Sequence, residues 1–250
     1  MELDRPVRLG WHMVRVAQPR TFKRPTVLIV RAVADSASLD VAMPGETSQA
    51  VSIDAQGSLV VAGMHGVRVV AGAGAWRYQR IPVPPLAKLL AFLEGGFGGC
   101  ASPERREAIS LIDDADALSA GRIESWIVAR AVERDERVEA LFELLRMDES
   151  YGLVRFLLRE RLNFKSVSEL SRQYGVSESH FRRLCRQALG TNLKGELRRW
   201  RAADAILGIV DGRESLTRLA IGSGYSSSSH LSKDVKDFLG FSPCKIRQDH

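Results

Sequence analysis

One sequence pattern occurs twice near the C-terminus, as YGVSESHFRRLCRQALG at residues 174–190 and as GYSSSSHLSKDVKDFLGFSP at residues 224–243. Each copy has a glycine, then serine, then apolar residues at helical spacing, then a second glycine. Equivalent positions lie fifty residues apart, as in the pairs His180 and His230, Phe181 and Leu231, Cys185 and Val235, Leu189 and Leu239, and Gly190 and Gly240. Two short helices joined by a glycine turn, present twice, predict a duplicated helix-turn-helix.

The first copy divides into two helices and a turn. Ser166 is expected to cap the helix SVSELSRQY, with Glu169 at its third position. Gly175 provides the backbone freedom of the turn, and Ser177 caps the second helix, which we call the first reading helix. Its apolar positions share one face and are expected to be buried, namely Phe181, Leu184, Cys185 and Leu189. The residues left pointing outward are Ser179, Arg182, Arg183 and Arg186, a basic face suited to the DNA major groove.

The second copy follows the same plan with one extra residue in its turn. Ser215 is expected to cap LTRLAIGS, and Gly224 makes the turn. Either Ser226 or Ser227 then caps the second reading helix. The positions expected to pack inward are Leu231, Val235, Phe238 and Leu239, whereas the exposed positions are Ser228, Ser229, Ser232, Lys233 and Lys236.

A longer helix is predicted between the two copies. Strong helix formers continue through LKGELRRWRAADAILGIV, from Leu193 to Val210, and stop at Asp211 and Gly212. A helix of this length rises about 27 Å, close to the roughly 34 Å between successive major-groove faces. We therefore expect both reading helices to meet one side of a duplex.

The charge is divided unequally along the chain. Residues 1–140 contain 17 Lys and Arg against 17 Asp and Glu, whereas residues 141–250 contain 19 against 13, which is the whole net charge of +6. This asymmetry predicts a nucleic-acid-binding domain joined to a neutral one, and the two helix-turn-helix units predict double-stranded DNA as its partner. The alternative is a non-DNA adaptor protein, whose basic helical region is only a solvated bundle.

Catalytic and metal-binding patterns are missing from the sequence. Three cysteines, Cys100, Cys185 and Cys244, are dispersed, and there is no HExxH, P-loop or GxSxG. His180 and His230 are expected to pack or to contact phosphate, and the Asp113, Asp114 and Asp116 run to be a solvated helix face. We therefore expect no enzyme, cofactor or metal. No apolar stretch has the length of a signal or membrane span, which predicts a cytoplasmic protein without a membrane partner.

The N-terminal half predicts a β-rich body followed by helices. TVLIVRAVA, AVSIDA, SLVVAG and VRVVAG are expected to be strands within residues 25–80. Prolines 82, 84 and 85 interrupt this pattern. The following LAKLLAFLEGG predicts a short helix that ends at glycines. Two more helices are expected at about Pro103–Leu118 and Arg122–Leu145. Their apolar positions predict a homodimer seam, a partner groove or packing on the β body, and they include Ile109, Leu111, Ile112, Trp126, Ile127 and Val132.

The C-terminal hundred residues resemble the AraC family of bacterial transcription activators. The resemblance rests on two helix-turn-helix units, the long connecting helix and the closing GFSP at residues 240–243. It implies an all-α DNA-binding domain at residues 146–250. With the strands expected in the N-terminal half, the chain is predicted to be α+β, with a β-rich regulatory, oligomerisation or partner-binding domain at residues 1–145. It also places base reading on Ser179, Arg182 and Arg183, and on Ser228, Ser229, Ser232 and Lys233.

From about residue 84, the chain is similar to the AraC-type activators of type III secretion genes. PLAKLLAFLEGG, ESYGLVRFLLRE and LKGELRRWRAADAIL carry this similarity together with the two reading helices. It implies RNA polymerase as a partner and a secretion chaperone as protein co-activator. The alternative is a small-molecule-responsive regulator in which the β-rich part is a barrel that holds a ligand.

Overall fold

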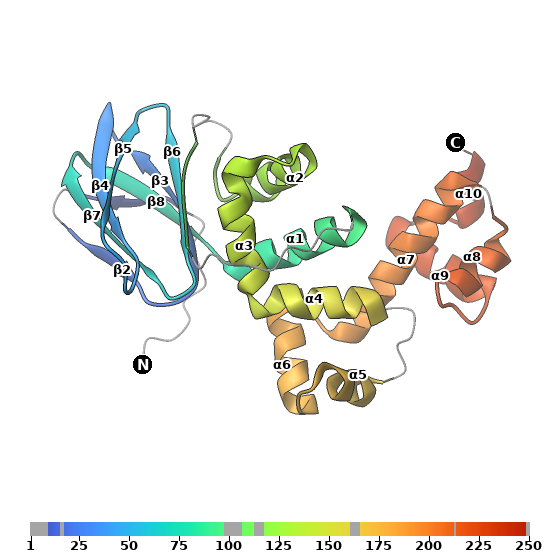
Figure 1. The fold of residues 1–250 in the computed structure, drawn as a ribbon. Coiled ribbons are helices and arrows are strands. Elements are labelled where there is room, and N and C mark those ends of the chain that lie inside the picture. The colour runs from blue at the N-terminus through green and yellow to red at the C-terminus, as the bar shows by residue number, and fades with distance from the viewer. Residues whose placement is uncertain are drawn as a thin grey trace. The chain divides into compact units, whose positions relative to one another are not determined.

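The computed structural model describes residues 10–15, 18–97, 107–112, 118–160, 166–212 and 214–248. The chain forms two compact units, Met1–Val154 (the N-terminal unit) and Arg155–His250 (the C-terminal unit). Every described strand belongs to the N-terminal unit, and the described secondary structure of the C-terminal unit is helical (Figure 1). The α+β prediction is confirmed. The domains predicted at residues 1–145 and 146–250 are defined by their roles, and that division stays a prediction.

Two antiparallel sheets form the body of the N-terminal unit (Figure 1). The five-stranded sheet has the order β1 (His12–Val14), β8 (Trp76–Ile81), β3 (Thr26–Ala32), β6 (Ser58–Gly63) and β9 (Glu107–Ile112). The four-stranded sheet has the order β2 (Arg20–Phe22), β7 (Val67–Ala73), β4 (Ser36–Ala42) and β5 (Gln49–Asp54). Both sheets contribute buried side chains to one core, among them Leu28, Leu39, Leu59, Val69 and Trp76.

The strands that were predicted are those rich in β-branched residues, and all four are confirmed as β3, β5, β6 and β7. The sequence reading missed β4 and β8, which begin at Ser36 and Trp76. In β4 buried residues alternate with more exposed ones, so the strand has no continuous apolar run. In β8 the arginines at positions 77 and 80 interrupt the apolar pattern in the same way.

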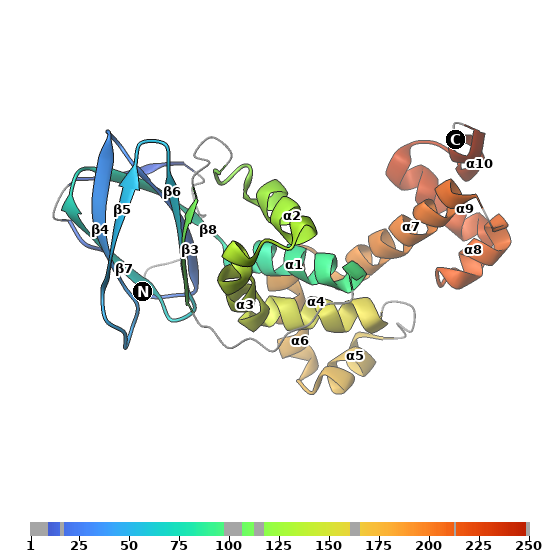
Figure 2. The same ribbon diagram turned by 45° about the horizontal axis from the view of Figure 1, so that its top comes forward.

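Helix α1 (Val83–Phe97) follows β8, whereas α2 (Ile123–Glu133) and α3 (Glu139–Met147) follow β9. Helix α1 packs against both α2 and α3 (Figure 2). Helix α3 also packs on β6 and β9. The expected helix after the prolines is longer than predicted, because α1 begins at Val83 and includes both Pro84 and Pro85. Proline is tolerated in the first turn, where its missing N–H has no helical partner.

The predicted helix at Pro103–Leu118 is wrong over its described part, because Glu107–Ile112 is the edge strand β9. It pairs with β6, with Ile109 opposite Val61. The open edge of β6 offers backbone hydrogen bonds, and Ile109 packs against the core of the sheets, as the third alternative for these apolar positions supposed. The predicted acidic run Asp113, Asp114 and Asp116 and the side chains of Leu111 and Ile112 lie outside what the structure describes.

The single helix predicted at Arg122–Leu145 is also wrong, because it is broken between α2 and α3. Arg134 adopts a left-handed conformation with φ of 54°, and Asp135 accepts a hydrogen bond from the Arg137 amide to begin the 3₁₀ turn Glu136–Val138. The Arg137 side chain also bonds this carboxylate and holds the pKa of Asp135 well below its usual range. The charged RDER sequence thus forms a corner.

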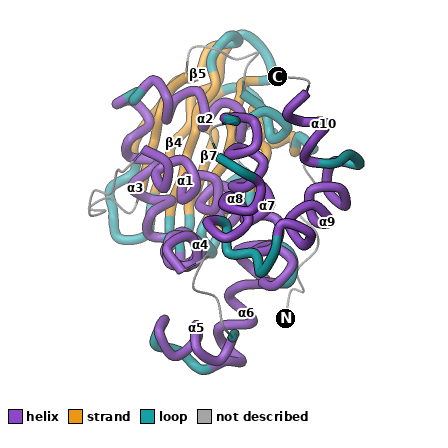
Figure 3. Tube along the Cα trace, turned by 90° about the vertical axis from the view of Figure 1, so that its right-hand side faces the viewer, coloured by secondary structure: helices purple, strands orange, loops and turns teal. Residues whose placement is uncertain are grey.

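The C-terminal unit consists of the end of α4 (Glu149–Glu160) and six further helices, α5 (Val167–Tyr174), α6 (Glu178–Leu189), α7 (Leu193–Asp211), α8 (Leu216–Gly222), α9 (Ser228–Leu239) and α10 (Pro243–Gln248). Helix α5 packs on α6, and α8 packs on α9, with α7 against α6, α8 and α9 (Figure 3). The predicted connecting helix is confirmed as α7, which ends at Gly212 with φ of 70°.

Candidate nucleic-acid interface

Local hydrogen bonds fix the first helix-turn-helix as the sequence predicts. The Ser166 side chain accepts from the Glu169 amide at 3.1 Å, and the Ser177 side chain accepts from the His180 amide at 3.3 Å. Gly175 caps the end of α5 in the left-handed region, with φ of 83°. The first reading helix is α6, and its start and orientation are therefore set by serine and glycine at the two ends of the turn.

Helix α6 has one buried apolar face and one exposed basic face. The four predicted core residues, Phe181, Leu184, Cys185 and Leu189, are all buried. The Phe181 ring lies edge-on to Phe156 at 6.4 Å between centroids and 5.7 Å from Tyr174. On the opposite face the predicted contact residues Ser179, Arg182, Arg183 and Arg186 are exposed, and His180 is half-buried.

The arginines of this exposed face differ in their partners. The Arg182 guanidinium lies 2.6 Å from the Glu178 carboxylate, one turn earlier on the helix. Arg183 makes no ion pair within the described chain, so its guanidinium is available to a ligand without breaking an existing contact. Beneath this face, burial raises the pKa of the Cys185 thiol to about 11, against the opposing charge of Arg182. Cys185 is therefore a protonated core residue at neutral pH, as predicted.

Helix α9, the second reading helix, repeats the geometry of α6. Ser227 is its cap, because its side chain accepts from the His230 amide at 3.2 Å. Ser226 instead bonds the His230 ring, with 2.9 Å between Oγ and Nδ1, and occupies the extra position of the turn. Of the predicted contact residues on this helix, Ser229, Lys233 and Lys236 are exposed, whereas Ser228 and Ser232 are half-buried.

Two residues that were expected to pack inward from α9 do not. Leu231 and Val235 are fully buried, but Phe238 and Leu239 are each 39% exposed, so the prediction for these two is wrong. At this end of α9 the neighbouring helix presents Arg198, whose guanidinium lies 5.2 Å from the Phe238 ring centroid. A cation stacked on an aromatic face is stable at a solvated surface. The core beneath α9 therefore ends at Val235.

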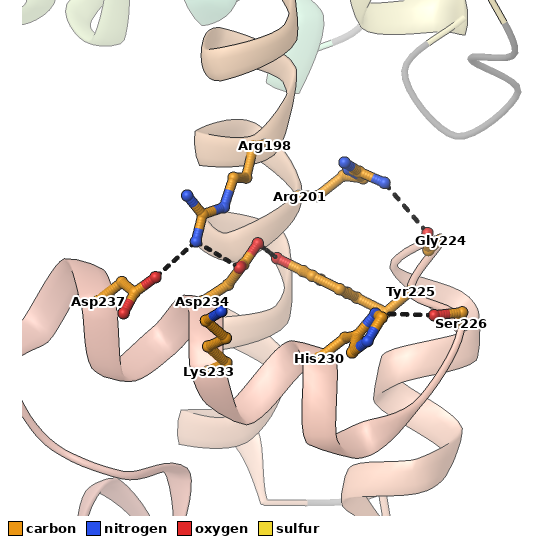
Figure 4. Close-up of a pocket in the computed structure, with 9 residues that line it drawn as sticks. All are labelled: Arg198, Arg201, Gly224, Tyr225, Ser226, His230, Lys233, Asp234 and Asp237. Atoms are coloured by element: carbon orange, nitrogen blue, oxygen red, sulfur yellow. Dashed lines mark hydrogen bonds and ion pairs between the residues drawn. The ribbon is translucent and has the colours of Figure 1, made fainter.

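An ion-pair network joins α7 to α9 (Figure 4). One Arg198 nitrogen lies 2.7 Å from the Asp234 carboxylate and 2.6 Å from that of Asp237. These two carboxylates raise the pKa of Arg198. The Tyr225 hydroxyl donates to Asp234 at 3.2 Å, and burial is the main cause that raises the pKa of this phenol. The network ties the connecting helix to the second reading helix.

The sequence reading did not assign Arg198, Arg201 or Tyr225 to the site. In the sequence, the arginines of RRWR at residues 198–201 indicate only a basic stretch of the connecting helix. Arg198 and Arg201 are three residues apart, and this spacing places both on one face of a helix. That signal was available, but only the fold shows that α9 packs against this face.

Two classes of site are not observed in the described chain. Within the residues that the structure covers, no group of three or more His, Cys, Asp and Glu side chains is placed to hold a metal ion. None of the described helices has the length and apolar character needed to cross a membrane.

Two capped reading helices, each in its own helix-turn-helix and joined by one long helix, define a DNA-binding transcriptional regulator. A helix-turn-helix domain family matches residues 170–249. The invasion protein InvF of Salmonella typhimurium is 37% identical over 194 residues, which cover 76% of this chain and 89% of InvF. The chain belongs to the AraC-type family of helix-turn-helix transcriptional regulators, and the prediction of a regulator in place of an enzyme is confirmed.

Two further comparisons found similar proteins. The transcriptional regulator MxiE of Shigella flexneri is 34% identical over 172 residues, which cover 66% of this chain and 82% of MxiE. The crystal structure of a Chromobacterium violaceum regulator with an AraC-type DNA-binding domain is 21% identical and covers 39% of this chain and 89% of its own, with a TM-score of 0.36.

Proposed function

We propose that this chain activates transcription by reading promoter DNA with the exposed faces of α6 and α9. The observation that carries the proposal is the division of α6 into a buried apolar face and an exposed face with three arginines. Arginine pairs with guanine through two parallel hydrogen bonds, whereas serine discriminates poorly between bases. Helix α6 therefore supplies most of the sequence information, and α9 mainly holds the backbone with Lys233, Lys236 and its serines.

The first prediction concerns salt. Binding of the full chain to its promoter is expected to weaken steeply as salt rises, with a slope of log K against log salt of about −5 for five or six phosphate contacts. The physical reason is the release of cations condensed on the DNA. Fluorescence anisotropy with labelled duplex, from low to physiological salt, measures the slope. A flat titration would reject DNA as the partner and favour the non-DNA adaptor.

The second prediction separates base reading from backbone contact. Arg183→Ala is expected to weaken binding to the cognate site by about 1 to 3 kcal/mol and to relax base preference there. Arg182→Ala should act in the same direction with a smaller loss, because Arg182 must exchange its exposed ion pair with Glu178 for the base. Competition assays with cognate and random duplexes measure both effects.

Lys236→Ala is the matched control for the arginine changes. It also removes one exposed cation from a reading helix, but it should weaken cognate and random DNA alike. Equal losses on the two duplexes for Arg183→Ala would show that α6 does not read bases.

We further propose that the regulated genes encode type III secretion proteins, and that the chain acts in the cytoplasm with RNA polymerase. The support is the similarity to InvF and MxiE, which extends well beyond the matched helix-turn-helix region and covers 89% and 82% of those proteins. A secretion chaperone is the proposed co-activator, as the resemblance of the sequence from residue 84 onward implies.

A groove in the N-terminal unit gives this partner a place to bind. It has a volume of about 650 Å³ and lies among α1, α2 and α3. Leu90, Leu93, Val132 and Phe142 supply its apolar lining, and Val132 is 60% exposed. Of the positions for which the sequence predicted a seam or groove, Val132 therefore lines one, whereas Ile127 is buried. Leu93 is partly exposed, whereas Leu90 and Phe142 are buried. Exposed apolar side chains such as Val132 inside a charged rim are typical of protein-binding surfaces.

The rim of this groove is held by a buried ion pair. Arg146 lies 2.6 Å from Glu94, which connects α3 to α1, and 2.6 Å from Glu139 within α3 itself. The two carboxylates raise the pKa of Arg146 against the opposing effect of burial. The groove therefore has a fixed shape before any partner arrives, which reduces the entropic cost of binding.

A further inference from the structure

A second pocket lies in the C-terminal unit, between the connecting helix α7 and the start of α9 (Figure 4). It has a volume of about 580 Å³. The sequence predicted no pocket here. The lining residues include Arg201, Ser226 and His230. The others are Arg198, Gly224, Tyr225, Lys233, Asp234 and Asp237.

The charges inside this pocket do not cancel. Asp234 and Asp237 are both paired with Arg198, and Asp234 also accepts the Tyr225 hydroxyl. Arg201 and Lys233 make no ion pair with any carboxylate in the described chain. The lining therefore has three cations, Arg198, Arg201 and Lys233, against two carboxylates. The surplus positive charge favours an anion in the pocket.

The Arg201 guanidinium is held in place without using all its donors. One terminal nitrogen donates to the Gly224 carbonyl at 3.2 Å, and the guanidinium lies 5.5 Å from the Tyr225 ring centroid. Its Nε is buried and has no hydrogen-bond partner among the described residues. A planar guanidinium fixed in this way can offer two parallel N–H groups to phosphate oxygens.

The opposite lining of the pocket is polar and includes one cation. Ser226 and His230 are bonded to each other at 2.9 Å and lie side by side at the start of α9 (Figure 4). Lys233 is exposed three residues further along the same helix. A hydroxyl, an imidazole and an ammonium group therefore line the same pocket as Arg201, and hydroxyl and ammonium side chains are common phosphate ligands.

We propose that this pocket binds one phosphate group of the DNA backbone, with Arg201 as its anchor and Lys233 as the second cation. The proposal rests on the DNA-binding function proposed above. It extends DNA contact to the connecting helix α7, which lies outside both helix-turn-helix units. Through Arg201, α7 contacts the DNA directly and sets the position of α9 on the duplex. Arg198 is a positioning residue, because it occupies the two carboxylates that would repel the phosphate.

The test is a scan of the promoter duplex with single neutral methylphosphonate linkages, using the full chain and its Arg201→Gln variant. In the wild type, one neutral linkage opposite α9 should weaken binding on the order of tenfold, as the loss of a charge-assisted hydrogen bond does. Arg201→Gln should show the same loss on unmodified DNA, no further loss at that linkage, and a salt slope smaller by about 1.

Two variants separate the phosphate contact from a structural role. Arg201→Lys keeps the charge and should keep the salt slope while it weakens binding, whereas a structural defect would lower both variants equally. Arg199→Gln removes an arginine from the same helix whose partner is Glu196, and it should leave the linkage scan unchanged. Thermal melts of each variant show that the C-terminal unit is folded.

The possible outcomes decide the proposal. If Arg201→Gln remains sensitive to every neutral linkage to which the wild type is sensitive, the pocket does not hold a backbone phosphate. Inorganic phosphate added at constant ionic strength provides a separate arm: competition that is lost in Arg201→Gln would support the same anion site with free phosphate as its ligand. A wild type with no salt-dependent DNA binding would reject the proposed function itself, together with this extension of it.

Discussion

Replacement of Phe181 by alanine is expected to lower the stability of the C-terminal unit by about 3 to 5 kcal/mol. Phe181 is fully buried, and its ring packs against those of Phe156 and Tyr174. The loss is a large part of the roughly 5 to 15 kcal/mol that holds a domain folded. DNA binding at 37 °C should then be lost together with the fold of α5 and α6. Hydrogen exchange of the amides in these two helices measures the local stability of the full chain.

Phe238→Ala is the matched control for this change. Phe238 is also an aromatic residue on a reading helix, but it is 39% exposed and contacts Arg198 at the surface. Its removal should cost less than about 1.5 kcal/mol, which is the value of an exposed cation–π contact with some lost packing. A loss for Phe181→Ala as small as that expected for Phe238→Ala would show that the core of the first helix-turn-helix does not depend on Phe181.

Activation is expected to need the protein partner even when the promoter is occupied. In a reporter strain without the secretion chaperone, the intact chain should still bind its promoter yet give at least about tenfold less transcription, and the chaperone should restore it. A partner shifts a conformational equilibrium only if it binds one state more tightly than the other, and a tenfold shift needs about 1.4 kcal/mol of difference. Promoter occupancy and reporter output, measured in the same cells, separate the two steps.

Val132→Glu tests whether the chaperone acts through the groove that Val132 lines. It puts a charge on the exposed apolar lining of the groove and should abolish the response to the chaperone without changing DNA affinity. Val33→Glu is the control, because Val33 is an exposed valine of the N-terminal unit that does not line this groove. Full activation by the purified chain with polymerase alone would remove the co-activator and favour the small-molecule-responsive alternative.

The C-terminal unit was largely predictable because its signals are local. Serine caps and left-handed glycines act within three or four residues, so Ser166, Ser177, Ser215 and Gly175 could be assigned from spacing alone. The choice between Ser226 and Ser227 could not, because both follow the turn glycine and both hydroxyls find a partner on His230.

The wrong predictions share a different cause, which is the influence of distant neighbours. The Glu107–Ile112 segment has a helix-like pattern, but the free edge of β6 makes it a strand. Phe238 has the helical spacing of a core residue, but the helix opposite presents Arg198 there. Helix α2 ends at Arg134 in the left-handed conformation, and because this residue is not a glycine, the sequence does not indicate the end of the helix. Both β6 and Arg198 lie far along the chain from the segments that they affect, so local sequence patterns do not reveal these contacts.

One part of the candidate interface could be predicted from the sequence, and another part could not. The exposed residues of α6 follow from helical periodicity, because their environment is the helix itself. The pocket around Arg201 depends on the packing of α7 against α9, which joins residues more than twenty positions apart. Periodicity gives the face of a helix, but it does not give the helix that covers that face.

The caps and turns of α6 and α9 are equivalent, but their exposed side chains are not, with three arginines on one and serines and lysines on the other. Dimeric regulators that present two identical reading helices, related by a two-fold axis, match palindromic operators. A single chain with two unlike reading helices has no two-fold axis, so its DNA target must have a polarity. Inverting that target within a promoter would turn the whole chain around relative to the start of transcription. Its operators should therefore occur in one orientation.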